Sequence, residues 1–113
     1  MHTSLRMRQY QQQALASASP QQLIARLYDL GIAACHREDR IKLRSVLVEL
    51  ISSLDFERGG EIADRLHMIY EFCLHQSNVG PLDAVCELLV ELRNAWRDGV
   101  MATATRPTPS FAV

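Results

Sequence analysis

Apolar residues recur along the chain at steps of three and four, the spacing that places side chains on one face of an α-helix. No sustained alternation of apolar and polar residues predicts a strand. Four apolar stripes of this kind follow one another with short interruptions, a pattern that predicts an all-α fold, an antiparallel four-helix bundle. The stripes consist of Leu23, Leu27, Leu30 and Ala34; Leu43, Leu47, Leu50 and Leu54; Ile62, Leu66, Ile69 and Cys73; and Leu82, Val85, Leu89, Leu92 and Trp96.

Turn-forming residues stand between the stripes. A Gly-Gly pair at 59–60 and a Gly-Pro pair at 80–81 each predict a break between helices, and a charged cluster at 36–40 is consistent with either a turn or a solvated stretch of helix. Ser19 precedes Pro20 and begins a capping box, so the first helix of the bundle is predicted to start there.

The two ends of the chain differ from the middle. Residues 1–18 are rich in Gln and poor in large apolar side chains, which predicts a short additional N-terminal helix that acts as an arm or a lid rather than as core. Residues 103–113 contain two Pro and only one charged residue, so they are predicted to form a flexible tail. The whole chain, 1–113, is expected to be one helical-bundle domain.

Composition narrows the class of protein. The chain has 113 residues, 48% of them hydrophobic, and 12 Lys and Arg against 13 Asp and Glu leave a net charge of −1. Because it has neither a basic excess nor a basic stripe, nucleic acid is not an expected partner. No apolar run approaches the roughly 20 residues that cross a bilayer, so no membrane insertion is expected. An odd number of scattered cysteines, three in all, fits reduced thiols in a cytoplasmic protein.

One set of side chains has metal-ligand chemistry. His67, Glu71 and His75 are spaced four apart and therefore share a helix face. A metal would need further ligands from a facing helix, and the di-iron signature of helical bundles places Glu and His three residues apart. We therefore favour a solvated polar face in which Glu and His are neighbours, and expect neither a metal nor another cofactor.

No catalytic signature emerges from the cysteines. Cys35 precedes His36 and Cys73 lies two residues before His75, but residues one or two apart on a helix do not face each other. The chain also lacks a Cys-x-x-Cys pair. Small buried cysteines are the favoured interpretation, and the chain is not expected to be an enzyme.

Several aromatic residues are candidates for a binding surface, because Tyr and Trp often anchor interfaces. Tyr10, Tyr28, Tyr70, Phe72 and Trp96 are the residues concerned. Plain core packing is the alternative interpretation for each, and the pattern alone leaves both open.

Four segments, in order, resemble a known family. The run SPQQLIARLYD at 19–29 resembles the "SP-x-x-LI-x-x-LYD" opening of the flagellar secretion chaperone FliS family. The run SLDFERGGEIA at 53–63 is similar to that family's "SLD-x-x-x-GGEIA", 66–70 is similar to its "L-x-x-(I/L)Y", and LRNAW follows at 92–96. Tyr10 matches an N-terminal Tyr of the family. The stretch 28–54 is roughly ten residues shorter than in the family, a loss of up to about three helical turns shared by two helices.

The resemblance implies a cytoplasmic, non-enzymatic helical bundle. Such proteins bind the disordered C-terminal segment of flagellin, prevent its premature polymerisation and deliver it to the flagellar type III export gate. The candidate flagellin-binding residues are those in the matching motifs: Tyr10, Ile24, Leu27, Tyr28, Ile69, Tyr70 and Trp96.

Two other functions stay open at this point. One is a metal-binding bundle built around His67, Glu71 and His75. The other is a self-associating bundle in which the same apolar edge pairs with a second copy, so that the free protein forms a homodimer.

Overall fold

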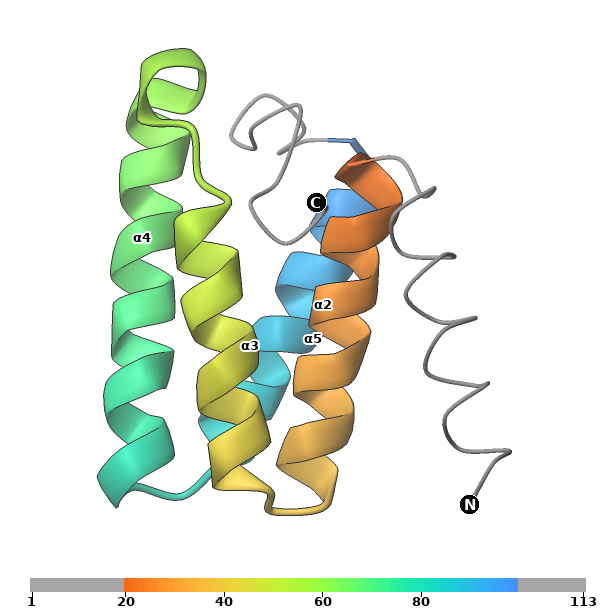
Figure 1. Cartoon of the computed structure of the whole chain (residues 1–113), viewed down its shortest axis with the longest axis vertical. Coiled ribbons are helices and arrows are strands. Elements are labelled where there is room, and N and C mark those ends of the chain that lie inside the picture. Colours follow the sequence, from red (N-terminus) through yellow and green to blue (C-terminus); the bar gives the residue numbers. More distant parts are fainter. Residues whose placement is uncertain (1–19, 100–113) are drawn as a thin grey trace, which may run out of the picture.

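The computed structural model describes residues 20–99, and all of the regular elements in that range are helices (Figure 1). The helices are α2 (Pro20–His36), α3 (Arg40–Ser52), α4 (Phe56–Val79) and α5 (Asp83–Arg97). The predicted all-α fold is confirmed. The expected arm at 1–18, the cap at Ser19 and the tail at 103–113 lie outside the described residues.

The turn between α2 and α3 forms within the charged cluster, so of the two alternatives the turn is the correct one. Glu38 adopts a positive φ of 55°, a conformation that ends helical geometry. Asp39 then caps α3, because its side chain accepts a hydrogen bond of 3.1 Å from the Lys42 backbone N–H. The break at 80–81 is confirmed as well, since α4 ends at Val79 and Gly80 is its C-cap.

The interruption of helical geometry expected at the Gly-Gly pair 59–60 is confirmed at Gly60. The helical turn before it begins at Phe56, where the Asp55 side chain accepts from the backbone N–H groups of Glu57 and Arg58. Gly60 has φ 47° and ψ −120°, values that are not helical, so it produces a kink after the first turn of α4.

Neighbouring helices of the bundle pack extensively at three interfaces and only sparsely at the fourth, between α4 and α5. In Figure 1, α3 lies beside both α2 and α4, and α5 runs behind them. Helix α2 packs extensively against α3 and α5, and α3 packs against α4, whereas α4 and α5 touch only sparsely. Helix α4 is therefore held mainly by α3, and much of its circumference is left without a helix partner.

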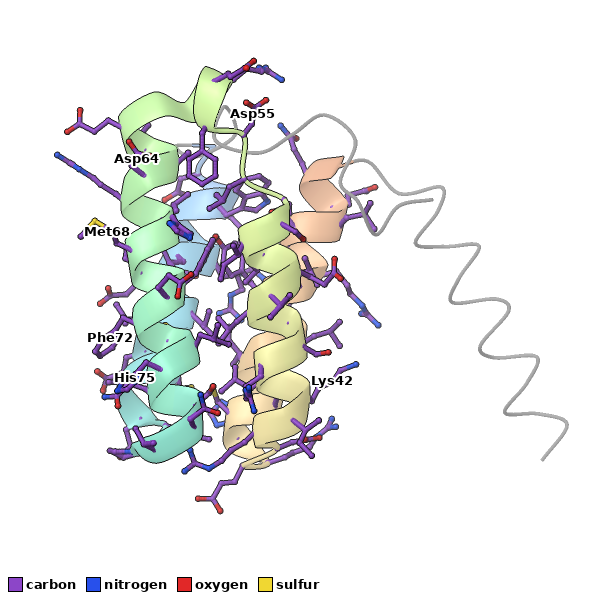
Figure 2. All side chains as sticks on the ribbon, turned by 60° about the vertical axis from the view of Figure 1, so that its left-hand side comes forward. Lys42, Asp55, Asp64, Met68, Phe72 and His75 are labelled. Atoms are coloured by element: carbon purple, nitrogen blue, oxygen red, sulfur yellow. The ribbon has the colours of Figure 1, made fainter. Side chains whose placement is uncertain are left out.

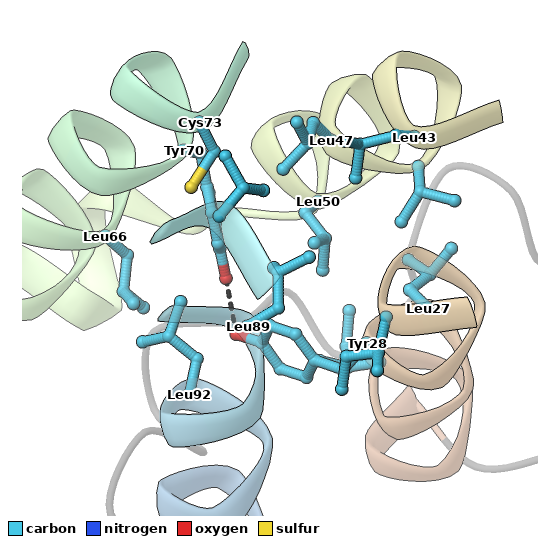
Figure 3. Close-up of a cluster of buried hydrophobic side chains, with 14 of the residues drawn as sticks. Leu27, Tyr28, Leu43, Leu47, Leu50, Leu66, Tyr70, Cys73, Leu89 and Leu92 are labelled. Atoms are coloured by element: carbon cyan, nitrogen blue, oxygen red, sulfur yellow. Dashed lines mark hydrogen bonds between the residues drawn. The ribbon is translucent and has the colours of Figure 1, made fainter. Parts of the chain in front are cut away.

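The predicted stripes at 43–54 and 82–96 are buried throughout, and the stripe of α2 is buried except for Leu30, which is only partly buried. Figure 3 shows how leucines of α3 and α5 surround Tyr28 and Tyr70 at the centre of the core. On α4 the predicted stripe is half confirmed: Leu66 and Cys73 are buried, whereas Ile62 is 38% exposed and Ile69 is only partly buried, and Ala63 and Tyr70 are buried in their place. Each isoleucine precedes a buried residue by one position, a rotation of about 100° around the helix axis, and so lies at the edge of the core.

Candidate peptide-binding surface

Helix α4 carries a second apolar stripe on the side opposite the core. Met68, Phe72 and Val79 are 71%, 45% and 73% exposed. Each follows a buried residue of α4 by two positions, a rotation of about 200°, which places all three on the outer side of the helix. Figure 2 shows Met68 and Phe72 projecting from the side of α4 that faces away from α3. We call these three residues the outer α4 stripe.

The distribution of apolar residues on α4 is that of a helix with more than one partner. A helix that packs on one side only normally has polar residues on the opposite side. Here the core-facing line and the outer α4 stripe are both apolar, and Ile62 and Ile69 lie between them at the border of the core. The outer α4 stripe is therefore an exposed surface suited to an apolar partner.

Charged residues of both signs border this surface. Arg65 and Glu61, about one and two turns before Met68, form an ion pair of 2.7 Å. His67 Nε2 lies 3.2 Å from Glu71 Oε1, as expected for neighbours on a polar face. On this side of α4, Glu61 and Arg65 continue the line of the outer α4 stripe, and the exposed His75 lies between Phe72 and Val79, so the surface combines apolar and polar side chains.

The arrangement around His67 and His75 offers a metal no converging ligands. His67 contacts Glu71 on its own helix and meets the Phe56 ring edge-on at a centroid distance of 5.7 Å. Within residues 20–99, no three His, Cys, Asp or Glu side chains are grouped so that they could hold a metal ion.

A buried aromatic network joins three helices. The hydroxyl groups of Tyr28 on α2 and Tyr70 on α4 are hydrogen-bonded to each other at 2.5 Å, the bond drawn in Figure 3. Trp96 on α5 packs against the Tyr28 ring at a centroid distance of 6.5 Å, and its indole N–H donates to the Gln21 carbonyl at 2.9 Å. Burial raises the pKa of Tyr28 to about 12 and that of Tyr70 well above its usual value. Both hydroxyls therefore stay protonated and the network is structural.

The motif residues identified from the sequence thus lie mostly inside the bundle. Five of the seven candidate binding residues are no more than 8% exposed, namely Ile24, Leu27, Tyr28, Tyr70 and Trp96. Ile69 is at the border of the core, and Tyr10 lies outside the described residues. A guest chain therefore cannot contact these five buried side chains in the structure as described, whereas Ile69 borders the outer α4 stripe.

Of the outer α4 stripe, only Phe72 was singled out by the sequence, as one of several aromatic residues. Met68 and Val79 were not predicted as surface residues, because the periodicity was interpreted as one apolar line per helix. The available signal was the spacing 68, 72 and 79, which repeats a helical face away from the core positions.

The cysteines confirm one expectation and add a contact. Cys35 and Cys73 are buried, and burial raises the pKa of each thiol to about 11. His36 does not pair with its neighbour Cys35. Its Nε2 instead lies 3.8 Å from Cys86 Sγ on α5.

None of the helices in the described part of the chain is both long enough and apolar enough to cross a bilayer.

Comparison with known proteins places the chain among flagellar proteins. The family model described as flagellar protein FliS matches residues 32–104, more than half of the chain. The chain is 28% identical to the flagellar secretion chaperone FliS of Campylobacter jejuni, over 87% of this chain and 93% of that protein. It is 30% identical to the flagellar secretion chaperone FliSB of Pseudomonas aeruginosa, over 88% of this chain and 98% of that protein. No solved structure matches.

Proposed function

The chain belongs to the flagellar protein FliS family, and from that premise we propose that it is a cytoplasmic, non-enzymatic export chaperone for flagellin. It binds the disordered C-terminal segment of flagellin, prevents premature polymerisation and delivers the subunit to the flagellar type III export gate. The names of its relatives, flagellar secretion chaperones, support a role in flagellar secretion, and the segment bound and the delivery step are our proposal.

The observation that supports this function best is the outer α4 stripe. A disordered segment that folds on binding presents an amphipathic helix, and such a helix binds by laying its apolar side on an apolar surface of the partner. Met68, Phe72 and Val79 offer that surface over three turns of α4.

The magnitudes indicate that the contact extends beyond these three residues. Covering the exposed parts of three large apolar side chains contributes roughly 3–5 kcal/mol. Ordering a disordered guest costs about 2–5 kcal/mol or more. Because the two nearly cancel, the guest must also cover neighbouring apolar surface, and the partly exposed Ile62 and Ile69 border the stripe.

The motif residues have two roles in this proposal. Ile69 contacts the guest directly. Tyr28, Tyr70 and Trp96, together with Ile24 and Leu27, contribute by fixing the helices that present the surface. Tyr10 belongs to the N-terminal arm, and Tyr10→Ala is expected to change the affinity for cargo while leaving thermal stability nearly unchanged.

The test is a calorimetric titration with a synthetic C-terminal peptide of flagellin from the same organism, with far-UV circular dichroism of the mixture. We expect binding with Kd of roughly micromolar or tighter and a gain of helicity beyond the sum of the two components. No heat and no gain of helicity would contradict the function.

A pair of variants locates the surface. Phe72→Asp is expected to weaken binding about tenfold or more, because it removes an apolar anchor and places a charge in the contact. Val48→Asp is the matched control, since Val48 on α3 is 51% exposed against 45% for Phe72 and lies outside the outer α4 stripe. Equal loss of binding in both variants would contradict the assignment to α4.

The same stripe supports a second proposal, a homodimer of the free chain. Two copies can cover the apolar residues of each other's α4 when no guest is present. Sedimentation equilibrium with and without the flagellin peptide tests this: we expect a dimer that dissociates as peptide is added. A chain that is monomeric without peptide would exclude the dimer.

A further inference from the structure

The exposed side of α3 combines apolar and basic residues. Ile41 is 84% exposed, more than any other large apolar side chain in residues 20–99, and Val48 is 51% exposed. The two are seven residues apart, so they lie on one line along the helix, about two turns from each other. The buried residues of α3 lie on the opposite side of the helix, so none of the described helices covers this line.

Basic side chains flank the line on both sides. Arg44 is three residues after Ile41, a rotation of about 60° to one side, and Lys42 is one residue after it, about 100° to the other side. Both are exposed, and neither forms an ion pair within residues 20–99. Figure 2 shows Lys42 projecting from α3 on the side away from α4. We call Ile41, Lys42, Arg44 and Val48 the α3 surface.

Acidic residues contribute little to the α3 surface. Glu49 is the only acidic residue of α3, and its Oε2 atom is buried with no hydrogen-bond partner among the described residues. Asp39 precedes the helix, and its carboxylate caps α3 by accepting from the Lys42 backbone N–H. The third basic residue, Arg40, donates to a backbone carbonyl near the C-terminal end of α4 at 3.1 Å. Lys42 and Arg44 are therefore the charges that α3 offers to a partner.

The basic residues occupy positions that are unfavourable for the helix itself. Arg40 and Lys42 lie in the first turn of α3, Arg44 follows in the second, and the first turn contains no acidic residue. The N-terminal end of a helix carries a partial positive charge, which favours acidic side chains there and disfavours basic ones. Because this choice of residues opposes local stability, binding explains it better than folding does.

We propose that the α3 surface is a docking site for an acidic, amphipathic helix of a partner protein. The apolar side of such a helix covers Ile41 and Val48, and carboxylates at its borders pair with Lys42 and Arg44. Complementary charge selects the partner, because two apolar side chains alone offer little area. The proposal does not depend on the proposed function: the α3 surface and the outer α4 stripe belong to different helices, so both can be occupied at once.

The test uses a synthetic helical peptide of about 20 residues, built from Glu, Ala and Leu with Leu at heptad spacing, and a twin in which every Glu is Lys. Fluorescence anisotropy measures their binding to the full chain at low and at physiological salt. We expect the acidic peptide to bind about tenfold or more tightly than its basic twin at low salt, and to bind several-fold more weakly at physiological salt, where the charges are screened. Equal binding of the two peptides, no binding of the acidic one, or no response to salt would each overturn the proposal.

Two charge-reversal variants locate the site. Lys42→Glu/Arg44→Glu should weaken binding of the acidic peptide about tenfold or more. Arg26→Glu/Arg97→Glu is the matched control, because it changes the net charge equally at exposed positions of α2 and α5, and it should change the affinity by less than about twofold. Equal losses would reveal an effect of net charge and overturn the proposal. Phe72→Asp should bind the acidic peptide like the wild type, and a loss there would assign the peptide to the outer α4 stripe instead.

Two further measurements distinguish docking from a structural role and from membrane binding. The Tm of Lys42→Glu/Arg44→Glu should equal or exceed that of the wild type, because acidic residues suit the start of a helix. A lower Tm would show that the two residues serve the fold and would overturn the proposal. The chain should stay in the supernatant when it is sedimented with vesicles of phosphatidylserine and phosphatidylcholine; vesicle binding that Lys42→Glu/Arg44→Glu abolishes would assign the surface to a membrane instead.

Discussion

The hydrogen bond between Tyr28 and Tyr70 allows a quantitative test of the buried network. The two side chains are 1% and 2% exposed, and each hydroxyl has the other as its hydrogen-bond partner. Tyr28→Phe or Tyr70→Phe removes one hydroxyl and leaves the other buried without a partner. Such an orphaned group costs about 1–3 kcal/mol of unfolding free energy, whereas removing both partners together is nearly neutral.

The double variant is therefore expected to be about as stable as the wild type and more stable than either single variant. Expressed as a double-mutant cycle, the coupling should be roughly 2–6 kcal/mol in favour of the pair, because it equals the sum of the two single losses when the double variant is neutral. Urea unfolding followed by circular dichroism gives the four free energies, provided that the m-value is the same in all four proteins.

The control cycle combines Tyr28→Phe with Ser45→Ala. Ser45 is exposed on α3, so the two effects should add. If the Tyr28 and Tyr70 substitutions also proved additive, the hydroxyl pair would not be a coupled buried contact, and the structural role given to these motif residues would be refuted.

Three further outcomes are expected. Above pH 10 the free energy of unfolding should fall, because the unfolded chain loses the Tyr28 proton near its ordinary pKa of 10.0 while the folded chain keeps it to about 12. The stabilisation that comes from this pKa difference is complete below pH 10 and is lost as the pH rises to 12. Tyr28→Phe should flatten that part of a urea-unfolding pH series. Leu47→Ala should cost about 2–5 kcal/mol of unfolding free energy, measured in urea, because Leu47 is 0% exposed. The neighbouring Val48 is 51% exposed, so Val48→Ala should change the free energy of unfolding by no more than about 0.5 kcal/mol. Equal losses would contradict the assigned face of α3. Gly60→Ala should lower the free energy of unfolding by about 1–2 kcal/mol through backbone strain alone, because Gly60 has φ 47° and an added Cβ would meet nothing within 4 Å. A thermal melt that shows no loss of stability would contradict the kink.

The helical faces were predictable where one apolar line faces one core. The leucines of α3 at 43, 47 and 50, and Leu54 just after the helix, are all buried, because their spacing defines a single face. On α4 the spacing of Ile62, Leu66, Ile69 and Cys73 is equally helical, yet only Leu66 and Cys73 of these are buried, alongside Ala63 and Tyr70. Periodicity fixes which residues share a side of a helix, and packing against α3 decides which side is buried.

The candidate sites were less predictable, because they depend on contacts between distant parts of the chain. His36 and Cys86 are 50 residues apart, and only the packing of α2 against α5 brings them together. The outer α4 stripe was visible as a spacing, but its exposure depends on α4 lying at the loose side of the bundle. The family motifs proved to mark the residues that hold the helices together at Tyr28, Tyr70 and Trp96.

The central claim, that the outer side of α4 receives the flagellin segment, is tested most directly by amide hydrogen exchange of the full chain with and without the flagellin C-terminal peptide. We expect the largest gain of protection in α4, over residues 61–79, where a bound helix would cover Met68, Phe72 and Val79. Protection gained elsewhere in residues 20–99 while α4 exchanges as before would contradict the account.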